Sequence, residues 1–526
     1  MPAFNRRDFF LHALAAGTIA PAIIGTTSSV GQASGSGTLR VPTAREANDL
    51  NPWKYSGLWV VSSLIYDPLV SYGPGGKIVP ALAESWTVSN DGLDYVFNLR
   101  KGVTFSDGAP FNADAALWNL KHWIGQSDHS WLSVSANFEA MRKIDDDKID
   151  IKLKAPASAA LIELSTINPM RFLSPASADA DGNYVKPVGT GRWVVVSSSA
   201  NGTEFVRNDK YWGDKPGHDR LSIPVIPEGR SRVAAMRAGE LDMMGGSFAA
   251  KISPQEAETL KTVTGVTVVT DTGTDTIVLG FNPNRAITKD PAVREAISLC
   301  LDRAAIAKVV MAGYADPTAN LFPPSVPYAG RREPVPNRDV EAAKQKLEAA
   351  GWTGDATRQK DGVPLALELV ISEDAVPGSR SLSEVIQSQL NEAGFGVTIR
   401  QVDHVTRHDD IPNMKYDMSL FITNGAPYDP HGSITIFFLS TFTSGTDGKM
   451  FVDAERLDPL LLKALGADEN GRDAAYQAVL DWLRDNHAIC PIYHAKRIWA
   501  HTDRVTKFVF PTTEYEMPDK GVVLTS

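Results

Sequence analysis

Residues 83–111 read AESWTVSNDGLDYVFNLRKGVTFSDGAPF. Within this stretch, Trp86-Thr87-Val88 and the run from Tyr95 to Leu99 are rich in aromatic and β-branched residues, which is typical of β-strands. Ser89-Asn90-Asp91-Gly92 lies between them and has the residues that a tight hairpin turn requires. The stretch therefore predicts a β-hairpin.

On both sides of this hairpin, strand patterns alternate with helix patterns. Near the C-terminal half, a strand at Leu365–Ile371, a helix at Ser381–Ala393 and a strand at Val397–Val402 predict a βαβ unit. Apolar periodicity from Pro291 to Met311 predicts helix throughout. The sequence thus indicates an α/β protein with mixed sheets.

Length and composition narrow the class of protein. The 526 residues predict two to four domains. With 43% hydrophobic and 22% charged residues the composition is that of a globular protein, not of a disordered, collagen-like or membrane-embedded chain. The formal net charge is −10, which argues against a nucleic-acid partner because phosphate binding needs a basic surface. The two cysteines, Cys300 and Cys490, are too few for a disulfide framework; we expect both to be buried, with a disulfide between them as the alternative.

The N-terminus predicts an export signal over residues 1–33. Arg6-Arg7 precede an apolar stretch from Phe9 to Ile24, and small residues follow it. The paired arginines favour the twin-arginine pathway, and a general secretory signal is the alternative. Because no cysteine lies near the cleavage site, we expect a periplasmic protein without a lipid or membrane anchor.

Motifs of enzymes and metal sites are absent from the sequence. It contains no phosphate loop, no His-Glu-x-x-His zinc motif and no Gly-x-Ser-x-Gly motif. His404 and His408 have the spacing of one helix face, but two solvated histidines explain them as well as metal ligands do. We therefore expect a protein that is not an enzyme and that holds no cofactor or metal of its own; an exported hydrolase or oxidase is the distant alternative.

A resemblance to a known family points to the function. Residues 83–111 resemble the family 5 solute-binding proteins of ABC importers, which include oligopeptide-, dipeptide- and nickel-binding proteins. Further segments resemble the family in the same order, namely Gly189-Thr190-Gly191, Arg207–Trp212, Gly239–Asp242, Phe281-Asn282, Val293–Ile297 and Asp302-Arg303.

The resemblance implies a two-lobed periplasmic binding protein whose hinged lobes close over a ligand. Lobe I is expected at 34–72, 188–283 and 492–526, with an inserted subdomain at 73–187, and lobe II at 284–491. The partners it implies are a small-molecule ligand and the membrane-spanning permease subunits of an importer, and we expect a monomer.

Two stretches most resemble the nickel-binding branch, Leu321–Ala329 and Gly425–His431. Peptide-binding relatives carry an acidic residue before the tyrosine of the second stretch, where it pairs with the peptide's ammonium group; here that residue is Pro427. The expected ligand is therefore a small anionic metal chelate of the nickel type or a polyaminocarboxylate complex such as one of EDTA, and a dipeptide or oligopeptide is the alternative.

The resemblance also implies which residues contact this ligand. Arg171 matches an arginine that holds carboxylates, for which its planar guanidinium is suited; a salt bridge between lobes is the alternative. Four aromatic residues are further candidates, with core packing as the alternative: Tyr55, Trp59, Trp131 and Tyr428. Asn424 and His431 are the last two; for His431 the alternative is a hydrogen-bonded histidine in a turn.

Two departures from the nickel-binding pattern concern the same site. Asp128 stands where those relatives have a second arginine, and residues 434–445 contain no histidine to ligate a metal directly.

Overall fold

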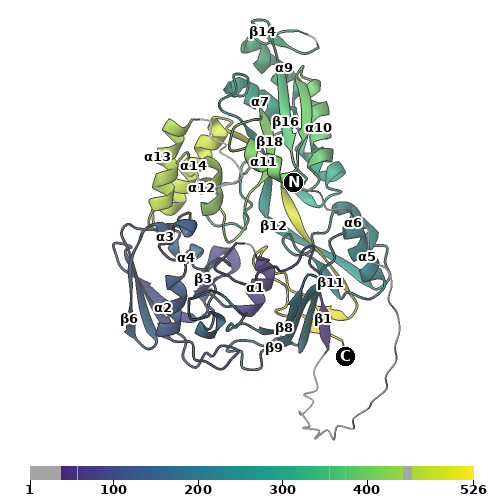
Figure 1. Ribbon diagram of the computed structural model, residues 1–526. Helices are drawn as coiled ribbons and strands as arrows, with labels where there is room; N and C mark the ends of the chain where they lie inside the picture. Colours follow the sequence, from purple (N-terminus) through teal and green to yellow (C-terminus); the bar gives the residue numbers. More distant parts are fainter. Residues whose placement is uncertain (1–36, 56, 355, 374, 442–452, 526) are drawn as a thin grey trace, which may run out of the picture. The chain divides into compact units, whose positions relative to one another are not determined.

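The computed structural model describes residues 37–525, except residues 56, 355, 374 and 442–452. The predicted export signal lies outside the described residues. No helix in the described ranges is long and apolar enough to cross a membrane. Residues 36–526 form one compact unit, drawn in Figure 1.

The predicted hairpin is confirmed and belongs to an antiparallel sheet of four strands, ordered β4-β5-β7-β6. Trp86 pairs with Phe97 and Val88 with Tyr95. The turn is closed by a hydrogen bond from Ser89 N to Asp94 O (2.9 Å). The bounds are β4 Ala83–Val88, β5 Asp94–Leu99, β6 Phe138–Asp145 and β7 Lys148–Leu153. Alternate residues of β5 are buried, so one face of this sheet packs against the core.

A second sheet of four strands has the order β1-β10-β9-β8. The N-terminal strand pairs parallel to β10, and the other pairs are antiparallel. The strands are β1 Thr38–Arg40, β8 Trp193–Ser199, β9 Gly202–Arg207 and β10 Arg220–Pro224.

The largest sheet is mixed and has the order β11-β19-β12-β18-β16-β17, with β13 added to β19. Its two long central strands, β12 and β19, pair antiparallel from Val266 opposite Thr502 to Gly280 opposite Ile489. The bounds are β11 Met243–Gly245, β12 Val266–Phe281, β13 Ala315–Pro317, β16 Ala366–Ile371, β17 Gly396–Gln401, β18 Met418–Ile422 and β19 Ile489–Thr502. The parallel pair of β16 and β17, joined by α10 (Ser379–Asn391), is the predicted βαβ unit.

Short strands and helices complete the fold. The strands are β2 Val70–Tyr72, β3 Ile78–Pro80, β14 Gln359–Lys360, β15 Val363–Pro364, β20 Val505–Lys507 and β21 Val523–Leu524. The helices are α1 Trp59–Ile65, η1 Pro74–Gly76, α2 Ala113–Lys121, η2 Ser127–His129, α3 Ser133–Ala136, α4 Ala160–Glu163, η3 Pro175–Ser177, α5 Gly229–Arg237, α6 Pro254–Leu260, α7 Pro291–Cys300, α8 Arg303–Ala305, η4 Ile306–Val310, α9 Val340–Ala349, α11 His404–Asp410, α12 His431–Phe438, α13 Ala454–Gly466 and α14 Arg472–Asp485.

The prediction of helix throughout residues 291–311 is wrong at Leu301 and Asp302. Leu301 has an extended backbone, and the Asp302 side chain accepts a hydrogen bond from Ala305 N and begins a new helix. Apolar periodicity continues through this break because both helices bury residues in the same core. A capping aspartate therefore decides what periodicity alone misses.

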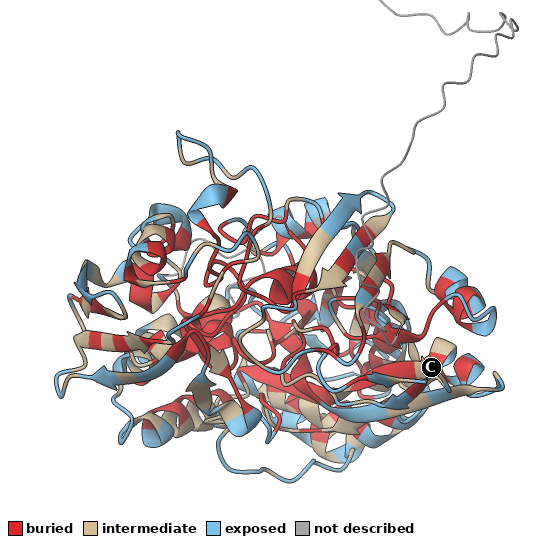
Figure 2. Ribbon diagram, turned by 90° about the horizontal axis from the view of Figure 1, so that it is seen from below, coloured by how far each residue is buried: buried red, intermediate tan, exposed pale blue. Residues whose placement is uncertain are grey.

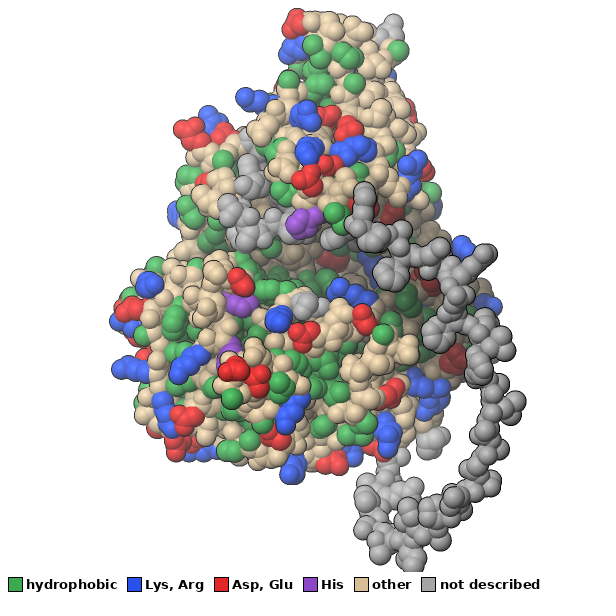
Figure 3. All heavy atoms as spheres, in the orientation of Figure 1, with side chains coloured by type: hydrophobic (Ala, Val, Ile, Leu, Met, Phe, Trp, Pro, Cys, Tyr) green, Lys and Arg blue, Asp and Glu red, His purple; other side chains and the backbone are tan. Residues whose placement is uncertain are grey.

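Separate hydrophobic cores underlie the different sheets. One core includes residues of α1, α2 and the hairpin sheet. A second lies between the large sheet and the helices α7, α9 and α10, and a third is formed by α12, α13 and α14. Figure 2 shows the buried residues along the strands and the exposed residues at hairpin turns and outer helices. On the face drawn in Figure 3, acidic and basic side chains are intermixed.

Candidate ligand-binding site

Four of the predicted aromatic residues come together although they lie far apart in the sequence. Trp59 begins α1, Tyr55 precedes it, Trp131 follows η2, and Tyr428 lies between β18 and α12. The Tyr428 ring centroid is 5.6 Å from that of Trp59 and 6.2 Å from that of Trp131. Trp131 Nε1 donates a hydrogen bond to the Tyr55 hydroxyl (2.8 Å). The fold thus brings these four residues together, and Trp59, Trp131 and Tyr428 pack in one small hydrophobic core with Tyr515 and Ile167.

The structure adds two aromatic residues that the sequence did not reveal, Tyr515 and Phe248. Tyr515 lies 4.9 Å from Tyr428 and 5.2 Å from Trp59 between ring centroids, and Phe248 stacks on it at 4.1 Å. Both lie in loops without a recognisable motif. We call the six residues Tyr55, Trp59, Trp131, Phe248, Tyr428 and Tyr515 the aromatic cluster.

Arg171 is buried beside this cluster. Its Nη1 donates to the carbonyl of Thr166 (3.0 Å), and the neighbouring Ile167 packs with Tyr428 and Tyr515. Burial lowers the pKa of Arg171 to about 10, against the opposing charges of Glu516 and Asp67. Arg171 forms no ion pair with another described residue, so the alternative of a salt bridge between lobes is not observed.

Three polar atoms in this region are buried and make no hydrogen bond within the described part of the chain. They are Nε of Arg171, Nδ2 of Asn424 and the hydroxyl of Tyr428. The backbone of Asn424 is held on both sides, because its N–H donates a hydrogen bond to Ser433 Oγ (3.0 Å) and its carbonyl accepts one from the Tyr515 hydroxyl (2.7 Å). Buried polar groups are usually hydrogen-bonded, so these three atoms are suited to bind a group that is not part of the protein.

His431 has a different environment from the other predicted residues. Its Nε2 lies 3.1 Å from Oε1 of Glu163, and its Nδ1 lies 3.4 Å from the Tyr476 hydroxyl. Glu163 also accepts hydrogen bonds from the backbone N of Ser133 and Val134, both at 2.8 Å. His431 therefore connects α12 to α4 and the start of α3, and its two ring nitrogens already have protein partners.

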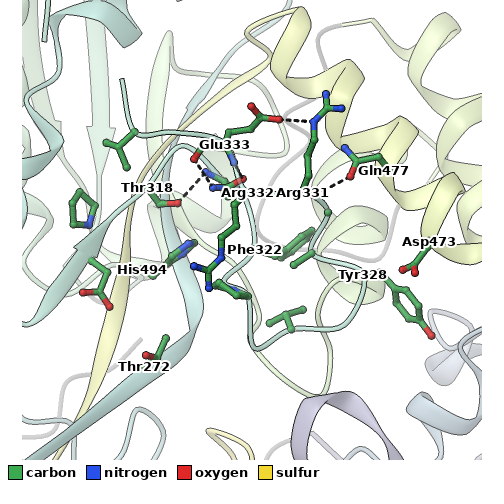
Figure 4. A pocket seen from close by; sticks show the side chains of 18 of the residues that line it. Thr272, Thr318, Phe322, Tyr328, Arg331, Arg332, Glu333, Asp473, Gln477 and His494 are labelled. Atoms are coloured by element: carbon green, nitrogen blue, oxygen red, sulfur yellow. Dashed lines mark hydrogen bonds and ion pairs between the residues drawn. The ribbon is translucent and has the colours of Figure 1, made fainter. Parts of the chain in front are cut away.

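A cavity of about 910 Å³ lies elsewhere, between the segment 316–335, α14 and the strands β12 and β19 (Figure 4). None of the seven predicted site residues lines it. Arg331 at its edge is paired with Glu333 (2.8 Å) and Asp481 (3.1 Å). Buried polar atoms without a hydrogen bond occur at several places in the described residues; three of them lie at the aromatic cluster and none belongs to a residue that lines this cavity, so we take the cluster as the candidate site.

Within the described ranges no group of three or more His, Cys, Asp or Glu is arranged to hold a metal ion. The arrangement at the aromatic cluster offers aromatic walls, one guanidinium and two further hydrogen-bond donors, which can bind a small molecule.

The fold is that of a two-lobed periplasmic binding protein. The model of the bacterial extracellular solute-binding proteins, family 5, matches residues 77–445, and the chain belongs to this family. Its members are the substrate-binding components of ABC importers.

Individual relatives confirm the resemblance to the nickel-binding branch. The nickel-binding periplasmic protein of Escherichia coli K12 is 31% identical over 461 residues, which cover 84% of this chain and 86% of the relative. The crystal structure of NikA from Brucella suis in complex with Fe(III)-EDTA has a TM-score of 0.87 at 31% identity and covers 93% of this chain and 100% of that chain. An ABC transporter substrate-binding protein from Sinorhizobium meliloti is 47% identical, with a TM-score of 0.83 and the same coverage. Glutathione- and peptide-binding proteins are also among the matches, at lower identity.

Proposed function

We propose that this protein binds a small anionic metal chelate and delivers it to an ABC importer. The chelate would be of the nickel type or a polyaminocarboxylate complex such as one of EDTA. Its carboxylates would bind Arg171, and its apolar faces would lie against the aromatic cluster. The nickel-binding relative and the Fe(III)-EDTA complex of the Brucella protein support this class of ligand.

One observation carries the proposal: the buried guanidinium of Arg171 keeps an unused Nε, and the buried Nδ2 of Asn424 and the Tyr428 hydroxyl are likewise without a hydrogen bond in the described residues. Leaving such groups unpaired costs about 1–3 kcal/mol each. A carboxylate-bearing ligand removes this cost, because a carboxylate accepts hydrogen bonds from a guanidinium and from an amide at the same time.

The transport role follows from closure of two lobes. In this proposal the lobes have the boundaries expected from the sequence, and β12 and β19 connect them. Ligand would stabilise the closed form, which the permease would recognise in the periplasm after export. This requires that the ligand bind the closed form more tightly than the open one.

Isothermal titration calorimetry with Fe(III)-EDTA tests the site. We expect the wild-type protein to bind and Arg171→Ala to lose affinity about ten- to a hundredfold, as for loss of a charged hydrogen bond. Arg171→Lys should recover only part of it, because an ammonium lacks the planar fork. Arg237→Ala, which removes an exposed arginine of α5, is the matched control. Equal affinity of the wild type and both Arg171 variants, at equal thermal stability, would contradict the proposed site.

A peptide is the alternative ligand. Native mass spectrometry of protein purified from the periplasm separates the two, because a retained chelate adds the mass of its metal and keeps its isotope pattern. A retained mass series that fragments into amino acids would support the peptide. Conversion of the ligand during incubation would favour an enzyme instead.

A further inference from the structure

Glu514 lies beside the aromatic cluster, where the sequence predicted no acidic residue. It directly precedes Tyr515 in the chain, and its Oε2 accepts a hydrogen bond from Ser247 Oγ (2.9 Å). Ser247 in turn precedes Phe248, which stacks on Tyr515. A Cβ added at Gly425 would lie 3.7 Å from Cγ of Glu514, so the loop that carries Tyr428 passes close to the same carboxylate.

The Glu514 carboxylate is only partly compensated. The residue is 4% exposed, and its Oε1 makes no hydrogen bond within the described residues. Two cations act on it: Arg497, whose Nε is 3.6 Å from Oε1, and Lys251, whose charge opposes the rise that burial causes in the pKa of Glu514. That guanidinium is already shared, because its Nη2 donates to Asp271 (2.7 Å) and its Nη1 to the carbonyl of Pro511.

A second buried carboxylate, that of Asp275 on β12, adds negative charge to the same region. Asp275 is 6% exposed. Burial first, and then the charge of Asp275, raise the pKa of Glu514 to about 7. Thr274, the neighbour of Asp275, accepts a hydrogen bond from Ala426 N (3.1 Å), which ties this part of β12 to the Tyr428 loop.

The structure assigns to Glu514 and Asp275 a subsite for a positively charged centre of the ligand, next to the aromatic cluster that Arg171 also borders. A buried carboxylate that is only partly compensated is stabilised further when another cation approaches it. The inference rests on the proposed function of the cluster as a ligand site, and it narrows the ligand to one that carries a cationic centre as well as a carboxylate.

The residue that precedes Tyr428 offers no charge to a cationic centre, because it is Pro427. Glu514 approaches the cluster from the C-terminal loop instead. The cationic centre is either the ammonium group of a peptide or the metal of a chelate, and both are attracted by a carboxylate.

Two pairs of probes test the subsite by calorimetry. Dialanine and N-acetyl-dialanine differ in the ammonium group, and Ni(II)-nitrilotriacetate and free nitrilotriacetate differ in the metal. In one of the two pairs we expect the wild-type protein to bind the probe with the cationic centre at least tenfold more tightly than the other probe. The pair that shows this preference tells whether the cationic centre is an ammonium group or a metal. In Glu514→Gln, which keeps the shape of the side chain, the ratio should fall to near one, and Asp275→Asn should lower it as well. Glu384→Gln, an exposed carboxylate of α10, is the control.

The outcomes separate this subsite from the proposed function. If Arg171→Ala weakens binding but both carboxylate variants keep the wild-type ratio, the subsite is wrong and the ligand site stands. If neither pair shows a preference in the wild-type protein, the subsite is also wrong. If none of the four probes binds but Fe(III)-EDTA does, the subsite is wrong and the ligand site stands; if Fe(III)-EDTA does not bind either, both proposals are overturned. Equal melting temperatures of Glu514→Gln and the wild type show that a lost ratio is not caused by unfolding.

Discussion

The Nε2 atom of His431 lies 3.1 Å from Oε1 of Glu163, and this pair joins two segments that belong to different predicted lobes. Both side chains are buried. Burial by itself raises the pKa of Glu163, but hydrogen bonds from His431 and from two backbone amides lower it below its ordinary value. The pair is therefore a specific contact between α12 and α4.

Removing His431 should destabilise the protein. In His431→Ala the buried Glu163 carboxylate loses its side-chain partner, which we expect to lower the free energy of unfolding by about 1–3 kcal/mol. Urea unfolding followed by circular dichroism measures this. His501→Ala, a partly exposed histidine of β19, is the control, and an equal loss in both variants would argue against a special role of the pair.

Glu514 should make stability depend on pH. Its pKa is raised from 4.5 to about 7 in the folded protein, so between these values the folded state binds more protons than the unfolded state. The free energy of unfolding should therefore fall as the pH rises from 4.5 through 7. Glu514→Gln should make this decrease shallower. Urea unfolding at pH 5, 6, 7 and 8 tests it, and an unchanged slope in the variant would contradict the assignment.

The ion pair of Arg192 and Asp519 should be essential for stability. Arg192 Nε and Nη2 donate to the two Asp519 oxygens (2.7 and 2.9 Å), and Trp193 Nε1 donates to the same carboxylate (2.8 Å). Both charged residues are buried. Asp519→Ala leaves a buried guanidinium without its partner and should cost about 3–5 kcal/mol. Thermal unfolding measures this loss of stability, with Asp503→Ala as the control variant. A melting temperature of Asp519→Ala within a degree of that of the wild type would refute the prediction.

The two cysteines should be unreactive thiols in the folded protein. Cys300 and Cys490 are both buried and unpaired, and burial raises the pKa of the Cys300 thiol to about 12. Because the thiolate is the reactive form, a thiol reagent should label neither residue before unfolding and both after it. Rapid labelling of the native protein would contradict this prediction. So would an intact mass that is two hydrogens lower than expected for two free thiols, because it would indicate a disulfide.

Much of the fold could be predicted from local patterns. The 83–111 hairpin and the βαβ unit follow from strand periodicity and turn residues, which act between near neighbours in the chain. The break at Leu301–Asp302 was missed, because apolar periodicity does not change when two consecutive helices face one core. The lobe boundaries remain a prediction.

The candidate site was predicted in part. The four aromatic residues do lie together, and Arg171 borders them, as the resemblance implied. Asn424 contributes an unpaired Nδ2, and His431 lies in a pair with Glu163. Tyr515, Phe248 and Glu514 could not be found, since no motif marks them.

The sequence by itself determined the family, the strand and helix patterns and the types of side chain available to the site, because these depend on residue identity and close spacing. The tertiary structure alone decided which of those side chains remain unpaired. Whether a guanidinium, an amide or a carboxylate is available for a ligand depends on burial and on partners from distant segments, such as Thr166 for Arg171 and Arg497 for Glu514. Such partners are set by packing and not by neighbours in the chain.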